Sequence, residues 1–296
     1  MTAKSSSTPD RRSWISRLWA LWLIIALVAG YFISTRLIPV PQVGLVRLEG
    51  DIYDEMADYV VEQLNYAKND PAIRAVVLKI NSPGGGVTAS ENLYYSILSF
   101  REQKPLIVSI DTLAASGGYY AASAGDVLYA KPSSSIGNIG VVSLLPSPSF
   151  VDEELITTGP FKLFGSTRAS YIRELEILKQ GFLEAVLVQR QDKLAVNKEE
   201  LARGELYVGI LAVDMGLIDK LGTLTDAVEE AAQLARIANY QVVDMSTIPG
   251  LEPPEPPLFT FKNEDSPKPE SRQDADIKTP QPGLYYRSLS QAEVTL

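Results

Sequence analysis

Hydrophobic and polar positions follow two different periods along the middle of the chain. Short runs rich in β-branched residues are typical of buried parallel strands, and apolar positions three or four residues apart are typical of helices. The expected strands are 43–48, 75–80, 106–110, 126–130 and 139–145, and the expected helices are 56–66, 89–101, 171–194 and 225–237. Because strands and helices alternate, the pattern predicts an α/β domain with a largely parallel sheet, which we place at residues 36–248.

The first part of the chain has a different pattern. Residues 18–34 carry no charge, and four basic residues precede them: Lys4, Arg11, Arg12 and Arg17. A run of this length lies at the short end of what spans a bilayer as a helix, and cationic residues favour the cytoplasmic side. We therefore expect a cytoplasmic segment at 1–17, a single-pass transmembrane anchor at 18–35, and the remainder of the chain outside the cytoplasm. A cleaved signal peptide, which has the same charge pattern, is the alternative.

The last part of the chain is rich in proline. Eight prolines between Pro253 and Pro282 lie among acidic and amide residues. Such a composition buries too little apolar surface to offset the entropy of ordering, so it predicts a disordered tail at 249–296. Residues 283–289 are an apolar exception, and we expect them to dock on the domain. One hypothesis is that Leu284, Tyr285 and Tyr286 enter a functional groove there.

Composition excludes several kinds of chemistry. The net charge of −9 argues against nucleic acid as a partner, because general nucleic-acid binding needs basic patches. The chain has no histidine and no cysteine. A Ser-His-Asp triad, a thiol nucleophile and thiolate metal sites are therefore impossible, and no calcium-loop spacing is present. We expect no metal and no other cofactor.

Two short motifs point to chemistry at one edge of the sheet. Asn81–Gly86 (NSPGGG) and Ala115–Tyr120 (ASGGYY) each follow an expected strand. Loops that follow parallel strands meet at the carboxyl edge of the sheet, where active sites gather. Ser116 would open a helix with its hydroxyl exposed to a ligand, as a nucleophile requires. The amides of Gly117 and of Gly84 or Gly85, which we expect to be uncovered, would form an oxyanion hole.

Without histidine, Ser116 needs a lysine or a carboxylate to take its proton. A lysine acts as a base only when it is neutral, and burial favours the neutral form by lowering the pKa of an amine. Four lysines lie on or near the expected sheet: Lys79, Lys104, Lys131 and Lys162. The turn-rich, apolar setting of Lys162 suits a desolvated amine best, but local sequence does not exclude the others.

The motifs in order resemble those of the SppA-type signal peptide peptidases. The matching segments are 80–86, 114–120, 158–162, 204–209 and 212–221, so the resemblance covers about residues 43–238. It implies a ClpP/crotonase-like fold with repeated ββα units, a membrane anchor and a ring-like homo-oligomer. It also implies cleavage of peptides left after signal-peptide removal. Matched residue by residue, Ser116 falls on the family's nucleophile and Lys162 on its general base.

One position departs from that family. Its pattern has a serine where this chain has Asn138, and a serine there would orient the lysine amine. Asn138 can accept a hydrogen bond through its amide oxygen, or the role falls to Ser134 or Ser135. Two other functions remain open: an inactive membrane scaffold that binds a partner, which the departure favours, and a crotonase-type acyl-CoA enzyme. The first motif also resembles Clp protease, but the histidine of that enzyme has no counterpart here.

Overall fold

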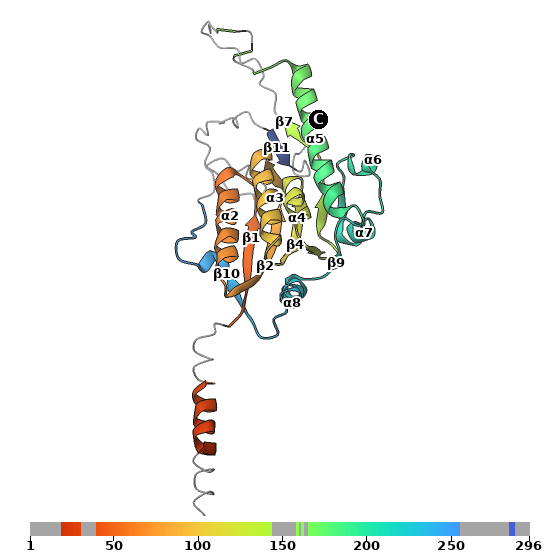
Figure 1. Ribbon diagram of the computed structural model, residues 1–296. Coiled ribbons are helices and arrows are strands. Elements are labelled where there is room, and N and C mark those ends of the chain that lie inside the picture. The colour runs from red at the N-terminus through yellow and green to blue at the C-terminus, as the bar shows by residue number, and fades with distance from the viewer. Residues whose placement is uncertain are drawn as a thin grey trace, which may run out of the picture. The chain divides into compact units, whose positions relative to one another are not determined.

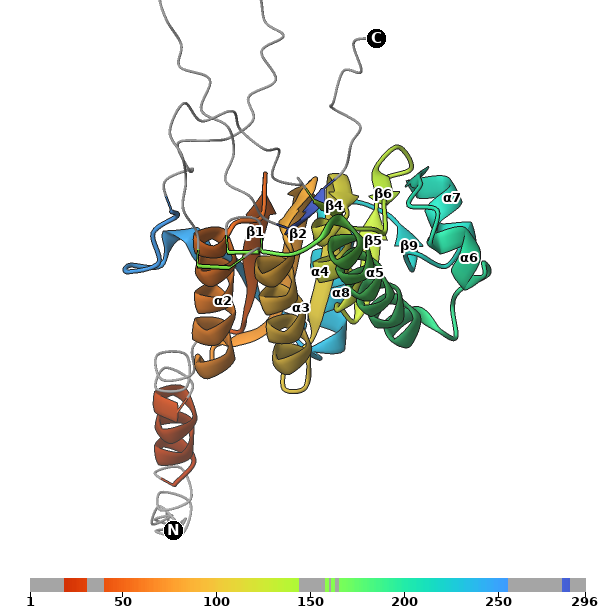
Figure 2. The same cartoon turned by 90° about the horizontal axis from the view of Figure 1, so that it is seen from above.

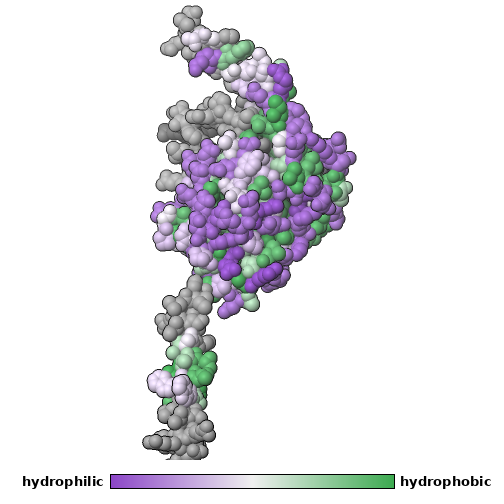
Figure 3. Space-filling view, in the orientation of Figure 1, coloured by the Kyte–Doolittle hydropathy of each residue, from purple (hydrophilic) through white to green (hydrophobic). Residues whose placement is uncertain are grey.

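The computed structural model describes residues 19–30, 40–143, 158–159, 161–162, 165–254 and 284–287, the last segment by its backbone alone. The chain divides into two compact units, 1–41 and 42–296. In the first unit, residues 19–30 form a helix whose surface is largely hydrophobic (Figure 3). Among the described residues, no helix is both long and apolar enough to cross a membrane. The rest of the predicted anchor, and all of segment 1–17, lie outside the described residues, so the anchor stays a prediction.

The second unit is built on an eight-stranded sheet (Figure 1). Its main path runs in the order β10-β1-β2-β4-β5-β9, and all pairs along this path are parallel. Two further strands complete the sheet: β6 pairs in parallel with the last three residues of β4, and β8 pairs antiparallel with β6. The strands are β1 (Gln42–Glu49), β2 (Ile73–Ser82), β4 (Leu106–Ala115), β5 (Val127–Ala130), β6 (Ser135–Gly137), β8 (Leu206–Val208), β9 (Lys220–Leu221) and β10 (Gln241–Asp244).

Helices cover both faces of this sheet (Figure 2). On one face lie α2 (Asp54–Asn69), α3 (Val87–Arg101), α4 (Gly117–Ser123) and α5 (Arg168–Arg190), and on the other lies α8 (Leu224–Leu234). Each face of the sheet has its own hydrophobic core, because side chains alternate along the strands. In β2, Val76 and Leu78 pack in the core on the side of α2 to α5, whereas Ala75 and Val77 pack in the core on the side of α8. Because both faces are buried, the strand is almost continuously apolar, as the sequence pattern required.

The predicted α/β class and parallel sheet are confirmed. The expected strands at 43–48, 75–80, 106–110 and 126–130 and all four expected helices are present, with bounds that differ by a few residues. The exception is β4, which continues to Ala115, directly before Ser116. Of the strand expected at 139–145, only β7 (Val142–Ser143) forms among the described residues. The architecture is consistent with a ClpP-like fold.

A buried ion pair holds the last part of the domain to the sheet. After α5, the chain forms α6 (Lys198–Leu201), β8 and α7 (Gly209–Asp214) before it returns as β9. Arg190, whose side chain is 1% exposed, donates through Nη1 to Asp219 at 2.7 Å and through Nε to the carbonyl of Gly216 at 2.9 Å. The Asp219 carboxylate also accepts the N–H of Leu128 in β5 at 2.8 Å. This contact fixes the segment around Gly216 against strand β5.

Candidate active site

Ser116 lies in the turn between β4 and α4, as the sequence predicted. Its φ of 53° is unusual for a residue with a side chain, and such a backbone costs about 1–3 kcal/mol. The turn is held on both sides: the Ser116 N–H donates to the carbonyl of Gly137, and its carbonyl accepts the N–H of Tyr120, each at 2.9 Å. Strained backbone of this kind gathers at functional sites, which makes Ser116 a candidate for chemistry.

The hydroxyl of Ser116, which was expected to be exposed to a ligand, is buried instead, and it has no hydrogen-bond partner within the described part of the chain. A buried hydroxyl without a partner costs about 1–3 kcal/mol, so it calls for a functional reason. Ser123, in the same helix, provides a contrast: its Oγ donates to the carbonyl of Tyr120 at 2.7 Å. Ser123 therefore has an ordinary structural role, whereas the Ser116 hydroxyl is left for another ligand.

Aromatic packing fixes the helix that follows Ser116. The Tyr120 ring is stacked on Tyr94 of α3, with centroids 4.7 Å apart, and meets Phe182 of α5 edge-on at 4.8 Å. Tyr119 is fully buried and donates its hydroxyl to the carbonyl of Leu217 at 2.8 Å. Burial raises the pKa of the Tyr119 phenol, so it remains a protonated donor. These contacts hold α4 between α3 and α5 and so position Ser116.

The glycine loop after β2 follows a close path along Ile52. Gly84, with a φ of 103°, accepts the Ile52 N–H at 2.8 Å, and the Gly86 N–H donates to the Ile52 carbonyl at 2.8 Å. A Cβ on Gly85 would lie 2.0 Å from the Ile52 carbonyl oxygen. Only glycine fits at position 85, since any side chain would force the two segments apart. The loop forms a short strand, β3 (Gly84–Gly86).

The two motifs meet at the carboxyl edge of the sheet, as predicted. Ser82, the last residue of β2, lies opposite Ala114 in β4. A Cβ on Gly118 would lie 2.8 Å from the Ser82 carbonyl oxygen, and α4 also contacts β3. The start of α4 is therefore in contact with the segment that leads into the glycine loop.

The amides proposed for the oxyanion hole differ in their surroundings. Gly117 is the first residue of α4, where an amide has no acceptor within the helix. The Gly84 N–H donates to the Oγ of Ser82 at 3.1 Å. Gly85 is paired in register with Tyr286 of β11 (Leu284–Arg287), which forms a three-stranded sheet with β3 and β7. The expectation that nothing covers the loop amides is therefore wrong.

Strand β11 also corrects part of the tail prediction. Four residues of the segment expected to be disordered form a strand. The signal was visible in the sequence as the apolar segment 283–289, but the place where it docks was not. Residues 255–283 and 288–296 lie outside the described residues, and disorder there stays a prediction.

Lys162 has a setting different from the one expected. It lies in a turn, its N–H donates to the Gly159 carbonyl at 3.2 Å, and its side chain is exposed. Within the described residues the Ser116 hydroxyl has no partner, so the chain by itself does not form a Ser116–Lys162 hydrogen bond. The role of Lys162 as a base stays a prediction.

The other candidate lysines have different partners. Lys79 pairs with Asp111 at 3.0 Å and with Glu49 at 3.5 Å, and Lys131 also pairs with Asp111. Hydrogen bonds from Lys131 and Lys79 hold the pKa of the Asp111 carboxyl below its usual value. Lys104 has a lowered pKa because it is desolvated, but it lies before β4, whose ten residues, about 33 Å in length, separate it from Ser116. These positions favour Lys162 by elimination.

Asn138 has a structural role that the sequence did not reveal. Its φ is 54°, its backbone N–H donates to the Glu205 carbonyl at 2.7 Å, and its Nδ2 donates to the Gly204 carbonyl at 2.8 Å. The side-chain oxygen is the atom left for a lysine, so its predicted orienting role is untested. Ser134 is a weaker alternative, because its hydroxyl donates to the Asp111 carbonyl at 2.6 Å and accepts the Lys131 N–H at 3.1 Å.

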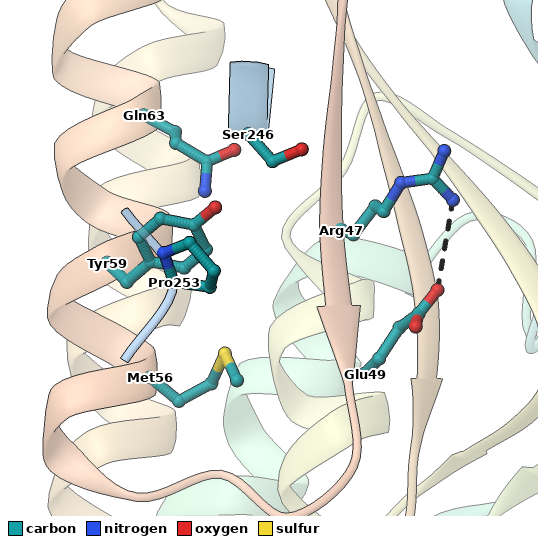
Figure 4. Close-up of a pocket in the computed structure, with 7 residues that line it drawn as sticks. All are labelled: Arg47, Glu49, Met56, Tyr59, Gln63, Ser246 and Pro253. Atoms are coloured by element: carbon teal, nitrogen blue, oxygen red, sulfur yellow. Dashed lines mark ion pairs between the residues drawn. The ribbon is translucent and has the colours of Figure 1, made fainter. Parts of the chain in front are cut away.

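Two further features do not compete with the site at Ser116. A pocket between α2, β1 and the segment after β10 contains none of the predicted site residues (Figure 4). It is lined by Arg47, Glu49, Met56, Tyr59, Gln63, Ser246 and Pro253. Among the described residues, no group of three or more acidic side chains is arranged to hold a metal ion.

The parallel sheet carries at its carboxyl edge a glycine loop and a buried serine whose hydroxyl has no partner among the described residues, an arrangement consistent with a ClpP-like α/β protein. Comparison with protein families agrees: the model of Peptidase family S49 matches residues 99–238, and that of Clp protease matches residues 37–136. The chain belongs to peptidase family S49, and its resemblance to SppA-type peptidases is confirmed.

Individual relatives carry protease names. A putative protease of Synechocystis is 31% identical over 209 residues, which cover 65% of this chain and 73% of the relative. Protease 4 of Haemophilus influenzae is 32% identical over 215 residues, 65% of this chain and 35% of its own length. A putative signal peptide peptidase SppA of Enterococcus faecium is 26% identical over 196 residues, 62% of this chain and 57% of its own. The matched region thus spans about a third of Protease 4. These relatives support a peptidase of the serine type.

Proposed function

We propose that the chain is a membrane-anchored serine endopeptidase with Ser116 as nucleophile and Lys162 as general base. The observation that carries the proposal is the Ser116 hydroxyl, which is buried at a strained turn beside the glycine loop and has no partner among the described residues. Membership of a peptidase family supports the same chemistry. Neither a metal nor another cofactor enters the proposal.

The mechanism follows from the residues at the turn. As the Oγ of Ser116 attacks the peptide carbonyl, Lys162 takes the serine proton, and it then gives that proton to the leaving amine as the C–N bond breaks. The Gly117 amide stabilises the oxyanion, together with the amide of Gly84 or Gly85 once the Gly84 bond to Ser82 or the Gly85 pairing with β11 has opened; losing one such donor typically costs about 2.7–4 kcal/mol of barrier. Water then hydrolyses the acyl-enzyme and regenerates the serine. Because the described chain leaves Lys162 exposed, the base reaches Ser116 by a local rearrangement or from another copy in a ring-like homo-oligomer.

The proposed substrates are extended apolar peptides such as signal-peptide remnants. The relative named as a putative signal peptide peptidase supports this class. We place the enzyme in the cell membrane, with the N-terminus in the cytoplasm and the peptidase domain outside it. The charge pattern before residue 18 and the uncharged run that follows support this arrangement.

The test uses the full chain in detergent with a fluorogenic apolar peptide and a serine-reactive fluorophosphonate probe. Ser116→Ala removes labelling and hydrolysis, while Ser123→Ala, the matched buried serine, keeps both. Lys162→Met lowers kcat by about 10²–10⁴-fold, the usual contribution of a general base. Lys104→Met keeps its activity, since Lys104 lies at the other end of β4. Unlabelled wild-type protein that is folded would contradict the proposal.

A second function is an inactive membrane scaffold that binds a partner. The exposed position of Lys162, which forms no hydrogen bond with Ser116 within the described residues, favours it. The same labelling experiment separates the two functions, because a scaffold has no need of an activated serine.

A further inference from the structure

One edge of the large sheet is only half covered. β10 pairs with β1 only as far as Leu45, and after Asp244 the chain forms a short 3₁₀ helix, η1 (Met245–Thr247). β1 itself continues to Glu49. Within the part of the chain that the structure describes, residues 46–49 therefore have no neighbouring strand on that side.

The backbone of this open part presents hydrogen-bonding groups at a regular spacing. Just after β1, the Gly50 N–H donates to the Asn81 carbonyl, on the side of β2. Because groups on successive residues of a strand point to opposite sides, the N–H and carbonyl groups of Arg47 and Glu49 face the open edge, about 6.6 Å apart. Among the described residues they have no backbone partner across it. An extended polypeptide has donors and acceptors at this spacing, and sheet edges bind peptides in this way.

The pocket shown in Figure 4 lies along this edge, between β1 and α2. Its volume is about 180 Å³, more than one water molecule needs. Met56, Tyr59 and Gln63 line it from α2, and their spacing of three and four residues places them on one face of the helix. The side chains of Arg47 and Glu49 extend from β1 away from these three residues (Figure 4), so β1 faces the pocket with its backbone.

The charged side chains of β1 differ in how firmly they are held. Arg47 donates through Nε and Nη2 to the Asp244 carboxylate at 3.0 and 2.9 Å, which holds it against β10. Glu49 has two longer ion pairs among the described residues, at 3.9 Å to Arg47 and 3.5 Å to Lys79. An added strand would place a side chain beside Glu49, and cross-strand pairs of opposite charge stabilise a sheet. A basic residue suits this position.

We propose that the open edge of β1 binds an extended peptide segment of another protein as an added strand. The peptide pairs through its backbone with Arg47 and Glu49. Its side chains alternate between the two faces of the sheet, so apolar residues pack on Met56 and Tyr59 while basic residues lie beside Glu49. The net charge of −9 also favours a basic partner. The proposal is independent of the proposed function, because the pocket contains no residue assigned to catalysis.

The test measures the binding of a fluorescent peptide in which lysine and leucine alternate. The protein is the full chain in detergent with Ser116→Ala, so that the peptide is not cleaved. The control peptide has the same sequence with N-methyl groups along one edge, which leaves the side chains unchanged and removes the N–H donors. Fluorescence anisotropy should show saturable binding of the first peptide and about tenfold weaker binding of the second. Equal binding of the two peptides overturns the proposal.

Variants of the protein locate the binding site. Glu49→Pro removes an N–H that faces the open edge and none that faces β2, so it should weaken binding about tenfold. Glu49→Ala keeps this N–H and should weaken binding by about two- to fivefold, through the lost charge. Met56→Gln should weaken it by about three- to tenfold, whereas Tyr66→Gln, at an exposed position of the same helix, should not. Unchanged binding in a folded Glu49→Pro variant, or in Met56→Gln if that variant does not fold, overturns the proposal.

Amide hydrogen exchange identifies the occupant of the edge. The Glu49 N–H should exchange fast in the free protein and slowly when the lysine–leucine peptide is bound. Slow exchange in the free protein at every concentration would show that another segment of this chain already pairs with β1. Slow exchange that appears only at high protein concentration would show that a second copy does. Either result overturns the proposal.

Discussion

Gly118, at the start of α4, lies directly against the carbonyl group of Ser82, at the end of β2. A Cβ on Gly118 would be 2.8 Å from that oxygen and 3.2 Å from the Ser82 Cβ. This contact sets the distance between the turn that holds Ser116 and the loop that supplies Gly84. Gly118, two residues after the proposed nucleophile Ser116, is thus required by the close approach of two segments, independently of any ligand.

Gly118→Ala should lower activity more than stability. The added methyl pushes the start of α4 away from Ser82, and a displacement of about 1 Å in an active site costs about 10²-fold in rate. Gly181→Ala is the matched control, because a Cβ at this position in α5 meets nothing within 4 Å. It should stabilise the protein by about 0.5–1 kcal/mol. Peptide hydrolysis and urea unfolding of both variants test this, and equal activities would refute it.

Gly85→Ala and Gly86→Ala should differ although they are neighbours. A Cβ at Gly85 would lie 2.0 Å from the Ile52 carbonyl oxygen, whereas one at Gly86 has its nearest contact at 3.7 Å. Gly85→Ala must therefore displace the loop from Ile52, which loses activity and about 1–3 kcal/mol of stability by overpacking. Gly86→Ala should keep its stability. Thermal unfolding measures both, and an unaffected Gly85→Ala would show that the loop can move without cost.

The parallel strands were predictable because they are buried on both faces. β2 and β4 read as nearly continuous apolar runs, and length and β-branching separate such runs from helices. Ser116 was predictable from the glycines behind it and from the strand before it. Short strands that pair with distant segments carry little local signal, and β6, β8, β9 and β10, of two to four residues each, were missed as strands.

The parts of the site that depend on distant pairing were less predictable. Nothing local to Gly85 shows that Tyr286 lies opposite it, because register between segments far apart in the sequence depends on the folded domain. The setting of Lys162 was expected from its apolar neighbours, but an exposed turn can carry the same residues. The roles of Asn138 and Arg190 became visible only when their backbone partners, Gly204 and Gly216, were in place.

The ion pair between Arg190 and Asp219 should make stability depend on pH. Burial, the largest single effect, raises the pKa of the Asp219 carboxyl, but the hydrogen bond and charge of Arg190 together with the hydrogen bonds from Lys193 and Leu128 outweigh it, so the folded-state pKa lies below the usual value. A carboxyl with a depressed pKa contributes stability that is complete above about pH 4, its unfolded value, and is lost as pH falls through the folded value.

Asp219→Asn should lower the free energy of unfolding by about 3–5 kcal/mol at pH 7, because it leaves the Arg190 guanidinium buried without its charged partner. The difference in the free energy of unfolding from the wild type should narrow as the pH falls below about 4, where the unfolded carboxyl becomes protonated, until the native carboxyl is protonated at its lower pKa. Glu184→Gln, an exposed site in α5, is the control and should change little. Urea unfolding from pH 7 to pH 2.5 measures both, and a difference that stays constant with pH would refute the role of the ion pair.

Asn138→Ser, which restores the residue typical of the family, should destabilise this chain. Asparagine tolerates the positive φ of 54° better than serine does, and its Nδ2 bond to Gly204 would be lost, at a combined cost of about 1–2 kcal/mol. Asn138→Gly separates the two effects, because glycine keeps the backbone conformation and removes only the hydrogen bond. The free energy of unfolding in urea should therefore be highest for the wild type. The value for Asn138→Gly should be close to that of Asn138→Ser or above it. An Asn138→Ser variant that is as stable as the wild type and more active would show instead that Asn138 orients the amine of Lys162 less well than a serine does.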